Sequence, residues 1–166
     1  FEELSNTINS ESLWKFNPRS YCRNKEDVIN YLNKSLLQKD NEERFPFIIF
    51  DLNLKKIIGT TSFYNYSKSN KTTSIGYTII GLDHQRKGYS YHSKYLMLDC
   101  CFNKMDFERV DFLIDNRNKK SIESVKKMGA IEEGILRSNI KLLDGTRRDT
   151  IVLSILKEEW KNQNKI

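Results

Sequence analysis

The most informative stretch of the sequence is Gln85-Arg86-Lys87-Gly88-Tyr89-Ser90, which joins an apolar strand to a long amphipathic helix. A junction of this kind points free backbone N–H groups and the positive end of the helix dipole at one place, where phosphates bind well. Gly88 lets the backbone come close to a ligand, and Arg86 and Lys87 add positive charge. The stretch matches neither the Walker pattern nor Gly-x-Gly-x-x-Gly. Taken alone, it predicts either a phosphate-binding loop or an ordinary solvated basic loop.

Upstream of this stretch, the pattern predicts two helices followed by three antiparallel strands. One amphipathic helix covers residues 1–13 and is broken at residues 17–20, and a second begins after the N-cap Asn24 and ends near Asp40. In the third strand, Ile75, Tyr77 and Ile79 are expected on one face. The three strands are expected at Phe45–Phe50, Lys56–Asn65 and Thr72–Gly81.

Downstream, the pattern predicts a long helix, a strand, a short helix that ends at the C′ residue Gly129, and a hairpin followed by a polar tail with Trp160. The order of elements indicates a single α/β (α+β) domain over residues 1–166, with a mixed, mostly antiparallel sheet and about four helices. The apolar face of the long helix is expected to consist of Tyr91, Tyr95, Leu98, Phe102 and Met105. The strands are expected at Arg109–Asp115, Ala130–Leu142 and Thr146–Leu156.

Composition and charge limit the classes of protein. The 166 residues suit one domain, and no apolar run approaches the roughly 18 residues of a membrane span. The formal charge of +6 favours an anionic partner: nucleic acid, an anionic membrane or a polyphosphate cofactor. A general enrichment in Lys and Asn would give the same charge without any partner. Cys22, Cys100 and Cys101 make an odd number of thiols, which indicates a reduced, cytoplasmic protein.

The stretch resembles the Gln/Arg-x-x-Gly-x-Gly/Ala loop of the GNAT N-acetyltransferases, with Ser90 in place of the last Gly or Ala. The resemblance covers nearly everything from Val28 on, and the final segments are similar to the branch that acetylates ribosomal proteins (RimJ/RimL-like). The segments that resemble the family, in its order, are Ser74–Tyr77, Asp115–Ser121, Lys127–Ala130, Glu133–Arg137, Asp144–Asp149 and Glu159-Trp160.

The resemblance implies that acetyl-CoA is the cosubstrate and that no metal takes part. It implies that the strand carrying Ile79 and Ile80 diverges from the strand Val110–Ile114, so that a backbone N–H near Ile79 or Ile80 polarises the thioester carbonyl. The family's first strand is then expected to precede Phe1. Relatives commonly form homodimers, and the residues leave open whether this chain does. The residues expected to bind the pyrophosphate are Gln85, Arg86, Lys87, Gly88, Tyr89 and Ser90.

Asn118 and Ser121 are the side chains that the resemblance implicates in the chemistry. In this branch the Asn binds the pantetheine or a water, and the Ser lies near the sulfur as a proton donor. Many relatives place a Tyr four residues after the Ser, where this chain has Val125, so Ser121 is the remaining hydroxyl. Read without the family, the pair is a helix N-cap.

The general base, the acceptor pocket and the basic surface stay open. Trp14 and Phe16 lie where this branch builds its acceptor pocket, with core packing as the alternative. Candidates for a base that acts through water are His84, His92 and Asp115, each better explained as a surface polar group than as a base. A basic run could contact the 3′-phosphate of CoA or form a solvated helix face, and it consists of Arg117, Lys119, Lys120, Lys126 and Lys127.

The function expected from the resemblance is direct transfer of an acetyl group from acetyl-CoA to a primary amine, either a protein N-terminus or a small molecule. One alternative is another acyl donor on the same fold, such as succinyl-CoA. The other is a basic module without catalytic activity that binds nucleic acid or the ribosome. The aromatic residues fall mostly at core spacing rather than between Lys and Arg, which counts against a nucleic-acid partner. We expect no membrane partner.

Overall fold

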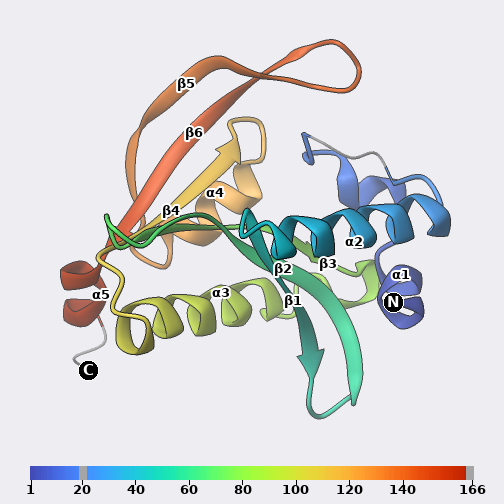
Figure 1. Ribbon diagram of the computed structural model, residues 1–166, viewed down its shortest axis with the longest axis horizontal. Coiled ribbons are helices and arrows are strands. Elements are labelled where there is room, and N and C mark those ends of the chain that lie inside the picture. The colour runs from blue at the N-terminus through green and yellow to red at the C-terminus, as the bar shows by residue number, and fades with distance from the viewer. Residues whose placement is uncertain (19–21, 164–166) are drawn as a thin grey trace.

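The protein is described by a computed structural model covering residues 1–18 and 22–163, built around one six-stranded sheet (Figure 1). The strand order is β1-β2-β3-β4-β6-β5, and β3 and β4 are parallel while every other neighbouring pair is antiparallel. The mixed, mostly antiparallel sheet predicted from the sequence is therefore confirmed. The strands are β1 (Arg44–Asp51), β2 (Lys56–Ser67), β3 (Thr72–Ile80), β4 (Arg109–Asp115), β5 (Ile131–Lys141) and β6 (Arg147–Leu156).

Helices cover both faces of the sheet and bury two separate apolar clusters. The cluster under α1 and α2 contains Trp14, Val28 and Ile79, and the cluster under α3 and α4 contains Leu98 and Val125. None of the described helices is long and apolar enough to cross a membrane. The helices are α1 (Glu2–Thr7), α2 (Lys25–Asp40), α3 (Tyr89–Asp99), α4 (Lys119–Lys126) and α5 (Lys157–Gln163), with short turns η1 (Glu11–Trp14), η2 (Leu82–His84) and η3 (Cys100–Lys104).

The ends of several helices differ from the prediction. The single helix expected over residues 1–13 is two pieces, α1 and η1, because the backbone is extended at Ser10. Phe1, at the start of the expected amphipathic helix, is 61% exposed. The expected break at residues 17–20 lies partly outside the described residues. The polar tail is in fact the helix α5, whose Trp160 packs in the core.

The long helix after the loop is also shorter than expected. It begins at Tyr89 and ends at Asp99, where a π-helical turn, η3, takes over. The wider turn shifts the residues beyond it around the axis, so Met105 at the end of the predicted apolar face is exposed. Tyr91, at the other end of that face, is exposed as well. Leu98 and Phe102 in the middle are buried, as predicted.

A β-bulge in β3 reverses the alternation of its side chains. Gly76 lies opposite Ser62 and Ile79 lies opposite Thr60, so two residues of β3 face one residue of β2. Tyr77, inside the bulge, has a left-handed backbone with φ 54°. The prediction that Ile75, Tyr77 and Ile79 share one face is wrong for this reason. Ile75 packs under α3, whereas Tyr77 and Ile79 pack under α2.

The parallel strands β3 and β4 separate after a short paired segment. Thr72–Ser74 pair with Arg109–Asp111, and no pairing continues beyond them. β4 stays paired with β6 as far as Asp115. The segment of β3 from Ile75 to Ile80 is therefore the one that separates from the neighbouring strand β4. The predicted splayed strand pair is confirmed, and it opens toward the carboxyl ends of both strands.

Candidate active site

The loop after β3 presents a row of free backbone N–H groups. Arg86 and Gly88 both have left-handed backbones, with φ 61° and 83°, which turns successive peptide groups the same way. Within the described part of the chain, no acceptor binds the N–H groups of Arg86–Ser90. The first bonds of α3 are made by Tyr91 and His92, both to the carbonyl of Gly88. Five free donors therefore lie at the positive end of the helix, where the sequence predicts a phosphate site.

Neighbouring strands hold this loop in place. The Gln85 side-chain Nε2 donates to the carbonyl of Ile80 at 3.3 Å, which ties the loop to the end of β3. The hydroxyl of Tyr89 and the carboxylate of Asp51 interact, which raises the pKa of Tyr89. The backbone N–H of Leu54 and then this hydroxyl lower the pKa of Asp51. The start of α3 thus interacts with the end of β1.

The backbone of β3 shows which amide faces the gap between β3 and β4. The N–H of Gly81 donates to the carbonyl of Ile58 on β2 at 2.9 Å. Successive N–H groups of an extended chain point to opposite sides, so the N–H of Ile79 faces β2 and that of Ile80 faces the gap. The carbonyl of Ile80, bonded by Gln85, faces away from β2 as well. Of the two candidate amides, the geometry favours Ile80.

Asn118 and Ser121 lie at the start of α4, just beyond the carboxyl end of β4. Asn118 Oδ1 accepts the N–H of Ser121 at 3.3 Å, so the N-cap anticipated from the sequence is present. Among the described residues, none bonds the Asn118 amide nitrogen or the Ser121 hydroxyl. Because β3 and β4 are parallel, this pair and the loop 85–90 follow the same edge of the sheet. The cap leaves both polar groups available.

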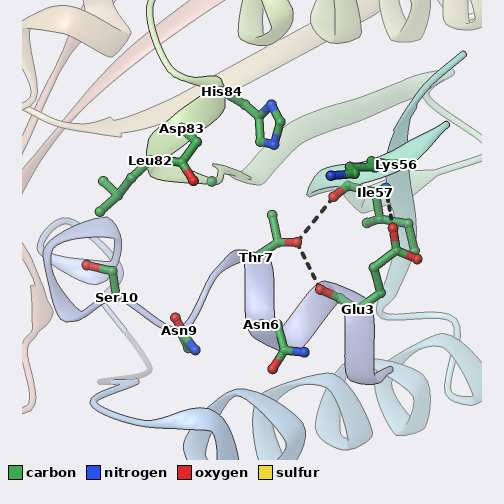
Figure 2. A pocket seen from close by; sticks show the side chains of 11 residues that line it. Glu3, Asn6, Thr7, Asn9, Ser10, Lys56, Ile57, Leu82, Asp83 and His84 are labelled. Atoms are coloured by element: carbon green, nitrogen blue, oxygen red, sulfur yellow. Dashed lines mark hydrogen bonds between the residues drawn. The ribbon is translucent and has the colours of Figure 1, made fainter. Parts of the chain in front are cut away.

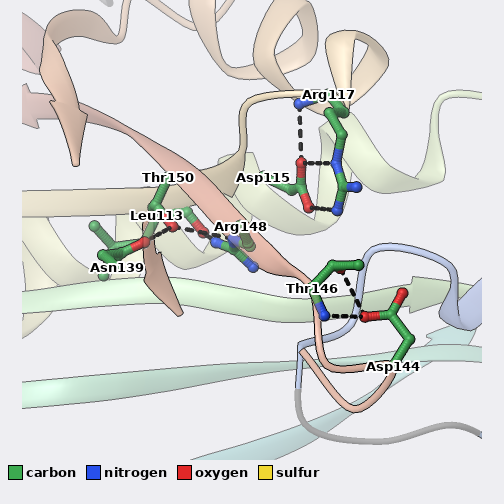
Figure 3. Close-up of polar contacts among 8 residues, drawn as sticks. All are labelled: Leu113, Asp115, Arg117, Asn139, Asp144, Thr146, Arg148 and Thr150. Carbon is green, nitrogen blue, oxygen red and sulfur yellow. Dashed lines mark hydrogen bonds and ion pairs between the residues drawn. The ribbon is translucent and has the colours of Figure 1, made fainter. Parts of the chain in front are cut away.

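Asp115 is poorly suited to be the general base (Figure 3). Burial alone would raise its pKa, but bonds from the Arg117 side chain and N–H outweigh burial and lower the pKa. The guanidinium Nη2 lies 2.7 Å from the carboxylate of Asp115. A carboxylate fixed in this way is a weak proton acceptor. The nearby Arg148 is buried and donates to the carbonyl of Leu113 at 3.2 Å.

The two histidines lie on different elements, His84 in η2 and His92 in α3. His92 is exposed on α3, and a Cβ added at Gly88 would lie 3.4 Å from its ring. His84, in η2, is half-buried, and no described residue bonds its buried Nδ1. His84 lines a hollow of about 440 Å³ between α1 and η2, and Figure 2 shows how its side chain lies among the other lining residues. Within residues 1–18 and 22–163, no carboxylate bonds either histidine so as to orient it as a base.

A cleft of about 640 Å³ separates η1 from the β5–β6 hairpin. Phe16 lines it, as expected for an acceptor pocket, while Trp14 is fully buried in the core and donates its indole N–H to the carbonyl of Ile8. Trp14 is therefore a packing residue. The cleft carries charges of both signs, from Glu11, Lys15, Arg117 and Asp144.

The predicted basic run is not one continuous surface of free charge. Arg117 pairs with Asp115, and Lys126 pairs with Glu132 at 2.8 Å. Lys119, Lys120 and Lys127 are exposed. These residues offer less free charge than their number suggests.

Two buried cations near the site were missed from the sequence. Arg44 of β1 is 2% exposed and stacks on the ring of Tyr77 at 3.8 Å, with Nη2 donating to the Tyr31 hydroxyl. Lys94 of α3 is buried behind the loop. A Lys at a core position of the helical pattern is the one signal that could have identified Lys94. Arg44 stands just before an apolar strand and gives no such signal.

Comparisons with known proteins agree on one family. The family model "Acetyltransferase (GNAT) domain" matches residues 1–131. The chain is 32% identical over 121 residues to "Probable N-acetyltransferase YjcK" of Bacillus subtilis, an alignment that covers 72% of this chain and 65% of that protein. The chain thus spans less than two thirds of the length of this relative.

Solved structures share the fold. A GCN5-related N-acetyltransferase from Brucella melitensis superposes with a TM-score of 0.83 at 20% identity, covering 95% of this chain and 69% of that one. A ribosomal-protein-S5-alanine acetyltransferase from Vibrio fischeri superposes with a TM-score of 0.76 at 23% identity, covering 96% and 88%. At these identities, the similarity concerns the fold.

Proposed function

The chain belongs to the acetyltransferase family defined by the GNAT domain, and on that premise we propose that it transfers an acetyl group from acetyl-CoA directly to a primary amine. The observation that carries the proposal is the gap between β3 and β4, with free amides at its carboxyl end. GNAT acetyltransferases use acetyl-CoA, whose pyrophosphate fits such amides and whose pantetheine fits an unpaired strand edge.

The loop residues fit the pyrophosphate. The left-handed Gly88 has only the ring of His92 near its missing Cβ, so the backbone is open on that side. The N–H groups of Arg86–Ser90 would bind the phosphate oxygens, and the exposed Arg86 and Lys87 side chains would add charge. The edge of β3 would bind the pantetheine arm.

The chemistry needs a neutral amine, a polarised carbonyl and a protonated leaving group. The amine attacks the thioester carbon, and the N–H of Ile80 stabilises the oxyanion that forms. As the C–S bond breaks, the hydroxyl of Ser121 gives its proton to the CoA thiolate. The attacking nitrogen loses one proton to water, which also restores the Ser121 proton. Asn118 positions the thioester by its free amide nitrogen.

The acceptor is a protein N-terminus or a small amine, in line with the RimJ/RimL-like segments of the sequence. The cleft between η1 and the β5–β6 hairpin is the candidate acceptor site. Its Lys15 beside Glu11 and Asp144 suits a ligand that carries both charges, while Arg117 is paired with Asp115. A peptide N-terminus that has acidic side chains nearby meets this condition.

The proposal is tested by following thiol release from acetyl-CoA with a panel of amines, and by the mass of the acceptor. Amine-dependent thiol release with a matching gain of one acetyl group is expected, with N-terminal peptides ahead of polyamines. Succinyl-CoA serves as the alternative donor in a parallel series. If no amine on the panel stimulates thiol release and the protein is not retained on immobilised CoA, the proposal is wrong.

A further inference from the structure

Lys94 lies one helical turn after the phosphate-binding loop and points back toward it. Lys94 is only 6% exposed. Nζ donates to Ser90 Oγ at 2.6 Å and approaches the carbonyl of Ser90 at 3.4 Å. No carboxylate of the described residues forms an ion pair with it. The ammonium is therefore buried with two neutral oxygens as its neighbours, immediately behind the five free N–H groups.

Such a charge is costly in the absence of a ligand, because burial without a counter-charge disfavours the ammonium. Consistent with this cost, burial lowers the pKa of Lys94 to about 8. Met97 and Leu98 on the same helix are buried in the apolar core, so an apolar side chain at position 94 would pack there without that cost. The unpaired ammonium calls for an anion that the protein itself does not supply.

The other titratable groups around Lys94 lie on η3, on β3, on the loop and on α3 itself. On η3, Cys101 faces the same core, and burial raises its pKa to about 12. On β3, the titratable residue Tyr77 packs under α2, on the other face. On the loop, Tyr89 interacts with Asp51, which raises the pKa of Tyr89. His92 is exposed on the outer side of α3.

The hydroxyl of Ser90 connects Lys94 to the loop. An ammonium can only donate, so Ser90 Oγ must accept from Lys94, and the Ser90 O–H proton is left to donate elsewhere. No described residue accepts it. A sixth donor is thus available beside the N–H groups of Arg86–Ser90, with a positive charge directly behind it.

We propose that Lys94 is a positioning residue for the pyrophosphate of the acyl-CoA: it orients the Ser90 hydroxyl as a donor and supplies the counter-charge behind the loop. This inference rests on the proposed function, since it needs a polyphosphate at the loop. It also accounts for Ser90 at a position where the family motif has Gly or Ala. The ligand-free protein carries the cost of the buried charge, and the bound anion removes it.

The proposal predicts how binding depends on pH. The anion stabilises the protonated Lys94, so its pKa is higher in the complex than in the free protein. Binding is then strongest below pH 8 and weakens as the pH rises through the free value of about 8. If binding raises the pKa of Lys94 by one unit, the affinity for acetyl-CoA at pH 7 is about tenfold higher than it would be without the Lys94 ammonium.

Equilibrium binding of acetyl-CoA without acceptor amine, measured by calorimetry from pH 7 to 9, is the test. Lys94→Met and Ser90→Ala are compared with Lys104→Met, which removes an exposed charge farther along the chain. At pH 7, Lys94→Met is expected to bind acetyl-CoA about tenfold more weakly, with the weakening at high pH abolished. Lys104→Met should behave like the wild type. Without ligand, Lys94→Met should unfold at a higher temperature than the wild type.

The outcomes separate the two proposals. If the wild type does not bind acetyl-CoA at any pH, the proposed function itself is wrong. If the wild type binds and Lys94→Met binds equally tightly with the same pH dependence, the role of Lys94 is refuted. Should Lys94→Met fail to fold, Ser90→Ala decides, since it breaks the connection while leaving the Lys in place; unchanged affinity there is equally contrary to the proposal.

Discussion

Asn118 carries a capping oxygen and the amide nitrogen to which we assign a role in catalysis. Its Oδ1 caps α4 by accepting the N–H of Ser121, while its amide nitrogen stays free at the carboxyl edge of the sheet. A cap of this kind contributes about 1 kcal/mol to stability. The two roles can be separated, because Asp is an equally good N-cap and has no N–H₂ group.

Asn118→Asp is therefore expected to keep the free energy of unfolding within about 0.5 kcal/mol of the wild type and to lower kcat/KM strongly. Asn118→Ala should lose both the cap and the activity. Urea denaturation together with the thiol-release assay checks both variants. If Asn118→Asp keeps the wild-type kcat/KM, Asn118 acts only as the cap of α4 and has no role in catalysis.

Ser121 is assigned as the proton donor to the leaving thiolate. Ser121→Ala should lower turnover by roughly 10²–10⁴-fold between pH 6 and 9, since this is the usual contribution of a general acid. Its backbone N–H still bonds Asn118, so the helix should be preserved. Turnover measured across this pH range is the check. A profile that matches the wild type at every pH excludes Ser121 as the donor.

Single residues show where sequence patterns are informative. Asn24 caps α2 as predicted, accepting the N–H of Asp27 at 2.9 Å, because capping is a local interaction. Gly129 ends α4 with φ 90° for the same reason. The left-handed Tyr77 could not be predicted, since nothing local favours that conformation in a Tyr. Its bulge is maintained by partners distant in the sequence.

The element that depends most on one residue is the loop between β3 and α3. Gly88 has φ 83°, which L side chains rarely adopt. Gly88→Val is expected to strain the loop, turn its N–H groups away and weaken acetyl-CoA binding at least tenfold, a loss of about 1.4 kcal/mol. Calorimetry with acetyl-CoA measures it. The exposed Gly145, with φ 84° in the distant hairpin turn, provides the matched control Gly145→Val.

In that pair, a similar strain applies to both substitutions, but only one lies in the proposed site. Gly145→Val should cost stability and leave the affinity for acetyl-CoA unchanged. If Gly88→Val binds acetyl-CoA as tightly as the wild type, the pyrophosphate does not bind at this loop.

The bulged part of β3 is supported from the side of α2. Arg44 stacks on Tyr77, donates Nε to Ser62 Oγ at 2.8 Å and bonds the buried hydroxyl of Tyr31. Burial raises the pKa of Tyr31 to about 12, so its hydroxyl stays neutral at ordinary pH. This cluster fixes the strand just before the Ile80 amide.

Arg44→Met should therefore destabilise the protein by about 1–3 kcal/mol, because buried polar partners lose their bonds. It should also lower kcat more than it raises the KM for acetyl-CoA, because Tyr77 and the following amides lose their support. Arg44→Lys is expected to recover part of the stability. Guanidinium denaturation and steady-state kinetics test the two effects. If Arg44→Met is destabilised but keeps the wild-type kcat, Arg44 contributes only to packing.

At the level of elements, apolar periodicity located the strands but not every helix. The six strands are rich in β-branched and aromatic residues, and each lies within a few residues of its predicted range. The helix α5 was predicted as a tail, since a polar segment with one buried Trp has no periodic signal. The turn η3 was missed because a π-helical turn leaves the sequence pattern continuous while shifting the faces.

Across the whole molecule, the net charge of +6 has a local meaning. Several cations are paired, as in Lys71–Asp106 at 2.6 Å and Arg109–Glu133 at 2.8 Å. Arg86 and Lys87 of the loop are exposed and make no ion pair within the described residues. The charge that matters for the proposed function is concentrated at one end of α3, with the buried Lys94 behind it.

The arrangement of the candidate site also depends on how distant parts of the whole molecule come together. The divergence of β3 from β4 follows from the resemblance to the GNAT family and has no signature in apolar periodicity. The cleft beside Phe16 forms only when η1 and the distal hairpin come together, so no local pattern could predict its mixed charge. The sequence predicts the loop, Asn118 and Ser121 as site residues, whereas the burial of Lys94 and Arg44 is seen only in the packed structure.

The central claim is that the gap between β3 and β4 and the loop beyond it bind acetyl-CoA. Titration of ¹⁵N-labelled protein with acetyl-CoA, followed by amide NMR spectra, reports on every backbone N–H at once. We predict that the largest shifts arise at Arg86–Ser90 and Ile80, with smaller ones at Asn118 and Ser121. The account is contradicted if the Arg86–Ser90 and Ile80 amides stay unshifted at saturating acetyl-CoA. This holds whether or not the signals of Lys119, Lys120 and Lys127 shift.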